Sequence, residues 1–221
     1  MSEFATVIVT RPVTAAAGVY APGHVGELTQ YLPFELVDDV LVETKTVQRR
    51  LRDMPSRVGV YFVLALALFP QLGYARVWAK LTAGLAGMRL PSPSEKALRD
   101  LRRRLGPAPF KALFEIIAGP LAQPSTPGVC YRGLRTVAFD GCNSIKAPDT
   151  DANRSWLGRI RYRMGWAGYP TIRLMTLVET GARGLLGASL GSAKDRDEAT
   201  LARRLLPLLG PGTLVLLDRA F

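Results

Sequence analysis

Two aspartates, Asp140 and Asp218, each close a short apolar run of the sequence. The runs begin at Thr136 and Thr213. Continuous apolar runs are typical of strands that are covered on both faces, as in the centre of an α/β sheet. Ligands of such sheets gather at the carboxyl ends of the strands. We therefore expect two central strands to bring the two carboxylates close to each other.

Two neighbouring carboxylates repel each other unless a divalent cation joins them. Magnesium binds a few carboxylates together with water and substrate phosphate oxygens, an arrangement that serves the transfer of phosphodiester bonds. The pattern therefore predicts metal-dependent phosphoryl chemistry at Asp140 and Asp218. A plainer interpretation is that an aspartate after a strand is a turn or cap residue, and Asp140-Gly141 is a common turn dipeptide. Spacing alone leaves both interpretations open.

The amino-terminal half of the chain has apolar residues at helical spacing. The pattern predicts helices over residues 34–51, 57–69, 74–85, 93–105 and 110–118. In the first, Arg49 and Arg50 fall near the carboxyl end, where cations are favourable. The apolar run of the second is too short to span a bilayer and is closed by Pro70. In the fourth, Ser92 is the expected cap and Pro93 the first helical residue.

After a stretch rich in proline and glycine the pattern changes to a mixture of strand and helix. Two strands, over 171–180 and 184–190, are expected to be joined at Gly181, and a helix is expected over 194–209. Together with the strands that end at the two aspartates, these elements predict an α/β core. The chain is therefore expected to be of the mixed α+β class, with helices first and the sheet second.

The composition favours a polyanionic partner. The formal net charge is +11, which points to nucleic acid before membrane; an arginine-rich protein from a GC-rich genome is the alternative. The hydrophobic fraction of 48% excludes disorder over the whole chain. The two cysteines, Cys130 and Cys142, lack CxxC spacing, and no signal peptide is recognisable. These features predict a cytoplasmic protein without a disulfide scaffold or a zinc site.

Two clusters of cations are candidates for DNA contact. The first lies on the helix predicted over 93–105, which could be the second element of a helix-turn-helix pair; the alternative is a solvated basic face. It consists of Arg99, Arg102 and Arg103. The second cluster mixes cations and aromatics beside Asp140, a composition that suits backbone contact and base stacking. It consists of Arg154, Arg159, Arg161 and Arg163 with Trp156, Tyr162 and Trp166. The alternative is that these aromatics pack under a loop.

Several segments together resemble transposases of the insertion element 4 family. FDGCNSIKAPDTDANRSWLG, residues 139–158, is similar to the segment of that family that carries the first acid. LVLLDRAF, residues 214–221, is similar to the segment that carries the second. Residues 60–81 and 102–115 resemble the separate amino-terminal domain. The resemblance covers roughly residues 25–221.

The resemblance implies a DDE transposase that cuts and rejoins DNA at the terminal repeats of an insertion sequence. It implies that Asp140 and Asp218 are catalytic residues and the first and second ligands of Mg²⁺ or Mn²⁺, and that the partner is DNA. A homo-oligomer is a further possible assembly, and no membrane partner is expected. It also implies a ribonuclease H-like core after a helical domain. The expected organisation is a flexible tail, a helical domain with possible DNA binding, a linker and a catalytic domain, over 1–24, 25–120, 121–130 and 131–221.

The sequence departs from the family pattern in two respects. Cys142 replaces the usual threonine, and the helix with a Tyr, Arg, Glu, Lys signature that supplies the third acid is not found before Phe221. Glu179 and Glu198 are the only glutamates after the first acid, and their positions predict that neither replaces the third. The expectation is a truncated chain that is inactive alone. The alternatives are a non-catalytic DNA-binding fragment and a decayed pseudogene product.

Overall fold

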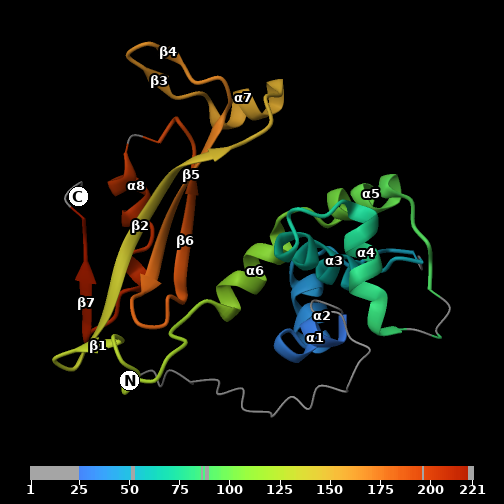
Figure 1. Cartoon of the computed structure of the whole chain (residues 1–221), viewed down its shortest axis with the longest axis horizontal. Helices are drawn as coiled ribbons and strands as arrows, with labels where there is room; N and C mark the ends of the chain where they lie inside the picture. Colours follow the sequence, from blue (N-terminus) through green and yellow to red (C-terminus); the bar gives the residue numbers. More distant parts are fainter. Residues whose placement is uncertain (1–24, 51–52, 86, 88–89, 196, 219–221) are drawn as a thin grey trace. The chain divides into compact units, whose positions relative to one another are not determined.

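The computed structural model describes residues 25–50, 53–85, 87, 90–195 and 197–218. The chain divides into two compact units, with the division between Ile117 and Ala118 (Figure 1). We call the described residues up to 117 the helical domain and those from 118 the sheet domain. The tail predicted over 1–24 lies outside the described residues. The expected mixed α+β composition is confirmed.

The helical domain packs its helices around a shared apolar core. The elements are α1 (Val25–Tyr31), α2 (Phe34–Glu43), α3 (Ser56–Leu68), α4 (Tyr74–Thr82), a 3₁₀ turn (Ala83–Leu85), α5 (Glu95–Leu105) and α6 (Ala108–Ile117). Helix α3 supplies several fully buried residues, including Tyr61 and Phe62. Helix α5 contributes a stripe of leucines at positions 98, 101 and 105, as its periodicity predicts. In the described residues no helix has the length and apolar character needed to cross a bilayer.

Two predicted helix boundaries in this domain are wrong. The helix expected over 34–51 ends at Glu43, because Thr44 donates its hydroxyl to the Val40 carbonyl (2.6 Å) and Lys45 has a φ of 56°. A left-handed residue of this kind stops a right-handed helix. Helix α5 is capped by Ser94 rather than Ser92, since the Ser94 hydroxyl accepts the Ala97 N–H at 3.2 Å.

The sheet domain contains one main sheet and a small separate hairpin. Its elements are β1 (Cys130–Tyr131), β2 (Leu134–Lys146), α7 (Asp151–Leu157), β3 (Arg161–Tyr162), β4 (Gly165–Trp166), β5 (Thr171–Glu179), β6 (Leu185–Gly191), α8 (Glu198–Arg203), a 3₁₀ turn (Leu206–Leu208) and β7 (Thr213–Leu216). Strands β2, β5 and β6 are consecutive antiparallel neighbours, whereas β7 pairs with β2 in parallel. Strands β3 and β4 form the hairpin.

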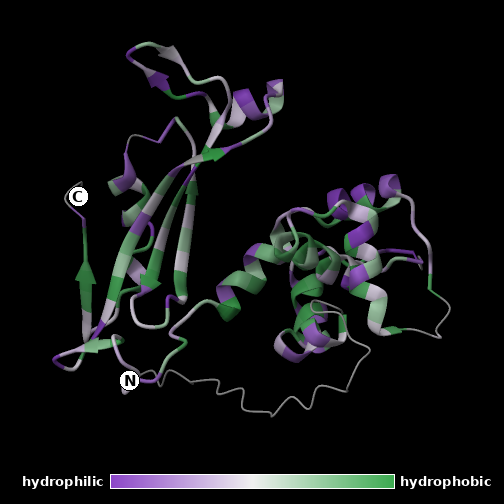
Figure 2. Ribbon diagram, in the orientation of Figure 1, coloured by the Kyte–Doolittle hydropathy of each residue, from purple (hydrophilic) through white to green (hydrophobic). Residues whose placement is uncertain are grey.

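One face of the main sheet packs against α8. Val137 and Phe139 of β2, with Met175 and Leu177 of β5, are buried against Leu201 and its neighbours. Because side chains alternate along a strand, the intervening residues of β2 point to the other face. Figure 2 shows this alternation of hydrophobic and hydrophilic residues along β2. The sheet therefore buries one set of residues and directs the other set, which includes Asp140, away from α8.

The helix predicted over 194–209 is much shorter than expected. Helix α8 begins after Asp197, whose carboxylate accepts the Thr200 N–H at 2.8 Å, and ends at Arg203. A short 3₁₀ turn around Pro207 follows, because proline lacks the N–H that an α-helix needs. The strands predicted over 171–180 and 184–190 correspond to β5 and β6. The predicted strand that ends at Asp218 is shorter, since β7 ends at Leu216.

Candidate active site and nucleic-acid contacts

The register between β2 and β7 relates the two candidate acids. The paired residues run from Arg135 opposite Thr213 to Ala138 opposite Leu216, a constant offset of 78 residues. Asp140 and Asp218 are separated by the same offset, two positions beyond the last pair. Strand β2 continues to Lys146, so the prediction that a strand ends at Asp140 is wrong, and Asp140 lies within β2. Asp218 lies two residues beyond the end of β7 at Leu216. The parallel pairing therefore leads the chain before Asp218 toward the part of β2 that carries Asp140.

The environment of the acids suits a hydrated cation. Both side chains are exposed, and the Thr176 hydroxyl on the neighbouring strand donates to the Asp140 main-chain carbonyl at 3.0 Å. Within the described residues, no three or more His, Cys, Asp or Glu side chains come together as they do in a complete protein metal site. Exposed carboxylates are among the oxygen ligands that magnesium takes together with water and substrate phosphates.

Glu179 is a structural residue. Its side chain is fully buried, and its carboxylate accepts hydrogen bonds from the Arg135 guanidinium and from the Ala122 N–H (3.2 Å). Arg135 also donates to the Ala122 carbonyl at 3.2 Å. These contacts join β2, β5 and the segment that follows α6. This cluster was not predicted from the sequence, because its members are far apart along the chain and carry no common motif.

Glu198 lies close to the strand that carries Asp140, but on the other face. A Cβ added to Gly141 would lie 3.0 Å from the Glu198 carboxyl carbon, and the Asn143 amide donates to the Glu198 carboxylate. Because Gly141 shares the α8 side of β2 with Phe139, Glu198 is on the side opposite Asp140. This position agrees with the expectation that Glu198 does not replace a third acid.

Two arginines of the second cluster are engaged by one carboxylate. Arg154 donates two hydrogen bonds to Asp149, both at 2.6 Å, and Arg159 donates to the same carboxylate at 3.1 and 3.2 Å. The Arg154 hydrogen bonds hold the pKa of the Asp149 carboxyl well below its usual range, and Arg159 adds to the effect. Both arginines therefore fix the start of α7 through Asp149, while their side chains stay 45% and 31% exposed.

The other two arginines lie on the β3–β4 hairpin, which Figure 1 shows beyond the carboxyl end of β2. Arg161 pairs across the hairpin with Trp166, and its guanidinium lies 5.6 Å from the indole centroid. Arg163 is exposed. The aromatic members of the cluster are also exposed, with fractions of 66%, 59% and 63% for Trp156, Tyr162 and Trp166. The interpretation that these rings pack under a loop is therefore wrong.

The comparisons with known proteins identify the relationship of this chain. A sequence model described as "Insertion element 4 transposase N-terminal" matches residues 22–115. The chain is also 29% identical over 194 residues to the transposase InsG for insertion sequence element IS4 of Escherichia coli strain K12. The chain carries an insertion element 4 transposase domain. The resemblance expected from the sequence motifs is therefore confirmed.

The similarity to the insertion element 4 transposase extends beyond the amino-terminal domain. The aligned region covers 88% of this chain, so it includes much of the sheet domain, but only 43% of the length of the relative. The chain therefore spans less than half of the curated relative that it matches. No solved structure matches the chain at a significant level.

The arginines on α5 lie within the region that matches the family's amino-terminal domain. Arg99, Arg102 and Arg103 are all exposed. The Arg102 guanidinium lies 5.8 Å from the Tyr74 ring centroid, and Arg103 lies 3.8 Å from the Asp100 carboxylate. The connection from α4 to α5 covers residues 83–94. It is much longer than the turn of a helix-turn-helix motif, which has about three or four residues. The arginines thus form a basic face, but α4 and α5 do not form that motif.

Proposed function

We propose that this chain serves DNA transposition through metal-dependent phosphodiester cleavage and strand transfer at insertion-sequence ends. The observation that carries the proposal is the parallel pairing of β2 with β7, which leads the chain before Asp218 alongside the part of β2 that carries Asp140. The match to insertion element 4 transposases supports the choice of DNA as the substrate. The net charge of +11 agrees with a polyanionic partner.

The sheet domain is proposed to be part of a ribonuclease H-like core. In support, three antiparallel strands are followed by α8 and then by a strand parallel to the first, whose end at Leu216 lies beside Ala138 of β2. Ligands of α/β sheets collect beyond the carboxyl ends of parallel strands. Asp140 and Asp218 would hold Mg²⁺ or Mn²⁺ there. A bound cation would offset the negative charge of the acids and polarise the phosphodiester group.

The chain's own cations are proposed to hold the DNA beside the acids. Arg161 and Arg163 extend from the β3–β4 hairpin, and in the sequence from 152 to 178 no acidic residue offsets them. The exposed rings of Tyr162 and Trp166 offer surfaces on which bases can stack. Arg154 and Arg159 would act indirectly, by fixing the segment that leads to the hairpin. The basic face of α5, with Arg99, Arg102 and Arg103, is a further proposed DNA contact.

The metal site is tested by titrating Mn²⁺ into the 221-residue chain and following the free ion by electron paramagnetic resonance. We expect Asp140→Asn and Asp218→Asn each to weaken binding about tenfold or more, a change of about 1.4 kcal/mol. Asp151→Asn is the matched control, because Asp151 is fully exposed on α7. Equal affinities in all four proteins would refute the assignment of the two acids.

A strand-cleavage assay on terminal-repeat DNA tests the chemistry. Because the described residues include no group of three or more His, Cys, Asp or Glu that could hold a metal ion, we propose that this chain alone binds such DNA without cleaving it efficiently. Robust cleavage in Mg²⁺ or Mn²⁺ would contradict that statement. Cleavage that persists in Asp140→Asn would contradict the catalytic assignment itself.

A further inference from the structure

The segment between α2 and α3, residues 44–50, is a loop that is held in place by its own polar groups. The hydroxyls of Thr44 and Thr46 lie 2.8 Å apart. Ser56, at the start of α3, donates its hydroxyl to the Thr46 carbonyl and its N–H to the Gln48 side chain, both at 2.8 Å. Ser56 is 1% exposed. The loop is therefore anchored to a buried point of the helical domain.

This loop and the end of α5 enclose a cavity of about 350 Å³ with a strongly positive lining. The Arg104 guanidinium reaches the region from α5 and donates to the Met54 carbonyl at 3.0 Å. Among the described lining residues four are cations and none is a carboxylate; they are Lys45, Thr46, Val47, Gln48, Arg49, Arg50 and Arg104. Since like charges in one cavity repel, an anion in the cavity would relieve the repulsion.

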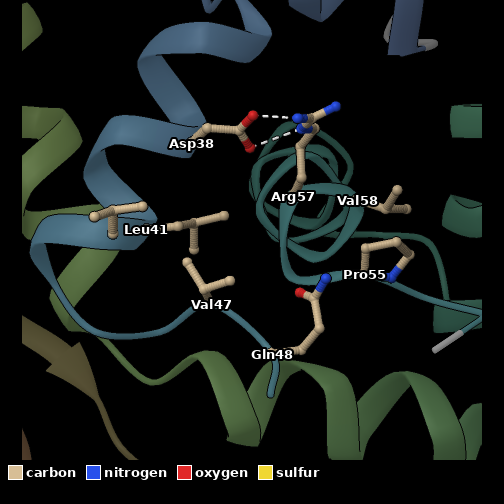
Figure 3. Close-up of a pocket in the computed structure, with 8 residues that line it drawn as sticks. Asp38, Leu41, Val47, Gln48, Pro55, Arg57 and Val58 are labelled. Carbon is tan, nitrogen blue, oxygen red and sulfur yellow. Dashed lines mark hydrogen bonds and ion pairs between the residues drawn. The ribbon is translucent and has the colours of Figure 1, made fainter. Parts of the chain in front are cut away.

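A neighbouring cavity contains an acid, Asp38, but this carboxylate is paired with another cation. That cavity shares Val47 and Gln48 with the first one, and its lining includes Asp38 (Figure 3). The Asp38 carboxylate is engaged by Arg57, whose Nε donates to it at 2.7 Å and whose Nη2 donates to its second oxygen. Asp38 is therefore already paired within its own cavity, and an apolar small molecule would find few matching groups among the described lining of the basic cavity.

We propose that the cavity lined by Lys45, Arg49, Arg50 and Arg104 binds a phosphate group of the DNA backbone. Guanidinium groups form charge-assisted hydrogen bonds with phosphate oxygens in a fork geometry. Lys45, Arg49 and Arg50 are exposed along one loop, so a chain of phosphates can reach them from outside. The choice of DNA over free phosphate rests on the proposed function, whereas the anion site itself does not.

The test uses the full 221-residue chain in EDTA, so that it does not depend on metal binding or cleavage. Binding to a short duplex of random sequence is measured by fluorescence anisotropy between about 50 and 200 mM salt. Each lost phosphate contact lowers the slope of log affinity against log salt by about 0.9. We expect this change for Arg49→Gln and for Arg50→Gln. The control is Lys111→Gln, which removes one exposed cation that pairs with Glu115 outside the cavity.

A second arm measures competition by inorganic pyrophosphate, to separate DNA from a free phosphate ligand. Reduced slopes for Arg49→Gln and Arg50→Gln, with Lys111→Gln like the unmodified chain, support the proposal. If the unmodified chain binds duplex and the variants show the same slope of log affinity against log salt, the proposal is overturned. This holds even if the variants no longer bind pyrophosphate. If the unmodified chain binds no duplex, the proposed DNA function fails; Arg49-dependent binding of pyrophosphate would then still support an anion site. Circular dichroism of each variant establishes that it is folded.

Discussion

Replacing Arg135 with methionine should destabilise the sheet domain, because it leaves a carboxylate buried without its cation. Glu179 is fully buried, whereas the Arg135 side chain is 23% exposed. Without the guanidinium, the Glu179 carboxylate would retain the Ala122 N–H as its hydrogen-bond donor. Breaking a buried pair in this way typically costs about 3–5 kcal/mol. Since Arg135 also holds the Ala122 carbonyl, we expect the segment after α6 to loosen as well.

The assay is amide hydrogen exchange of peptides that cover β2 and β5, which reports the free energy of opening of these strands. Arg135→Met should lower that free energy by about 3–5 kcal/mol. The double variant Arg135→Met/Glu179→Gln should recover much of the loss, because the neutral amide can still accept the Ala122 N–H. Lys111→Ala, which removes an exposed pair with Glu115, should change stability by less than about 1 kcal/mol. A loss below about 1 kcal/mol for Arg135→Met, or no recovery in the double variant, would refute the reasoning.

Two further predictions concern stability. Tyr61→Phe should lower the free energy of unfolding by about 1–3 kcal/mol. The buried Tyr61 hydroxyl, whose pKa burial raises to about 12, donates to the Leu32 carbonyl at 2.5 Å, and the variant loses this hydrogen bond. Thermal unfolding measures the loss, with Tyr31→Phe as the control, and equal melting temperatures of the two variants would contradict it. Asp149→Asn should destabilise the start of α7 at neutral pH, and the difference should shrink progressively as the pH falls below about 4. The reason is that the unfolded chain protonates Asp149 there, whereas Arg154 keeps the folded-state pKa of this carboxyl lowered. Melting temperatures of both proteins from pH 7 down to pH 3 test this, and a difference that does not change with pH would argue against the ion pair.

The sequence predicted the elements that depend on local periodicity. The leucines of α5 at 98, 101 and 105 are buried as expected, because a 3.6-residue period specifies one face without knowledge of the partner. Strands β5 and β6 also follow from their apolar runs. The predicted helix over 34–51 failed at Thr44, since side-chain bonding to the backbone and the left-handed Lys45 end the helix. Val47, which continued the period, is 47% exposed.

The sequence shows the candidate acids but not how their segments pair. The apolar runs before Asp140 and Asp218 are visible in the sequence, whereas the parallel pairing of β2 with β7 joins residues 78 positions apart. The four arginines near residue 160 look equivalent in the sequence. The structure divides them, because Asp149 engages Arg154 and Arg159. The basic cavity was missed because Arg49 and Arg50 were assigned to a helix that ends before them.

The parallel pairing of β7 with β2 has a consequence for the order of folding. Strands β2, β5 and β6 are consecutive antiparallel neighbours and can pair soon after they leave the ribosome. The contact between β2 and β7 must close a loop of 78 residues, and such long-range contacts form slowly because chain entropy opposes them. Asp218 therefore approaches the strand that carries Asp140 only after β7 has been synthesised and docked. If the two acids bind metal as proposed, a nascent chain would gain that affinity abruptly, and metal binding would report the docking of β7 on β2.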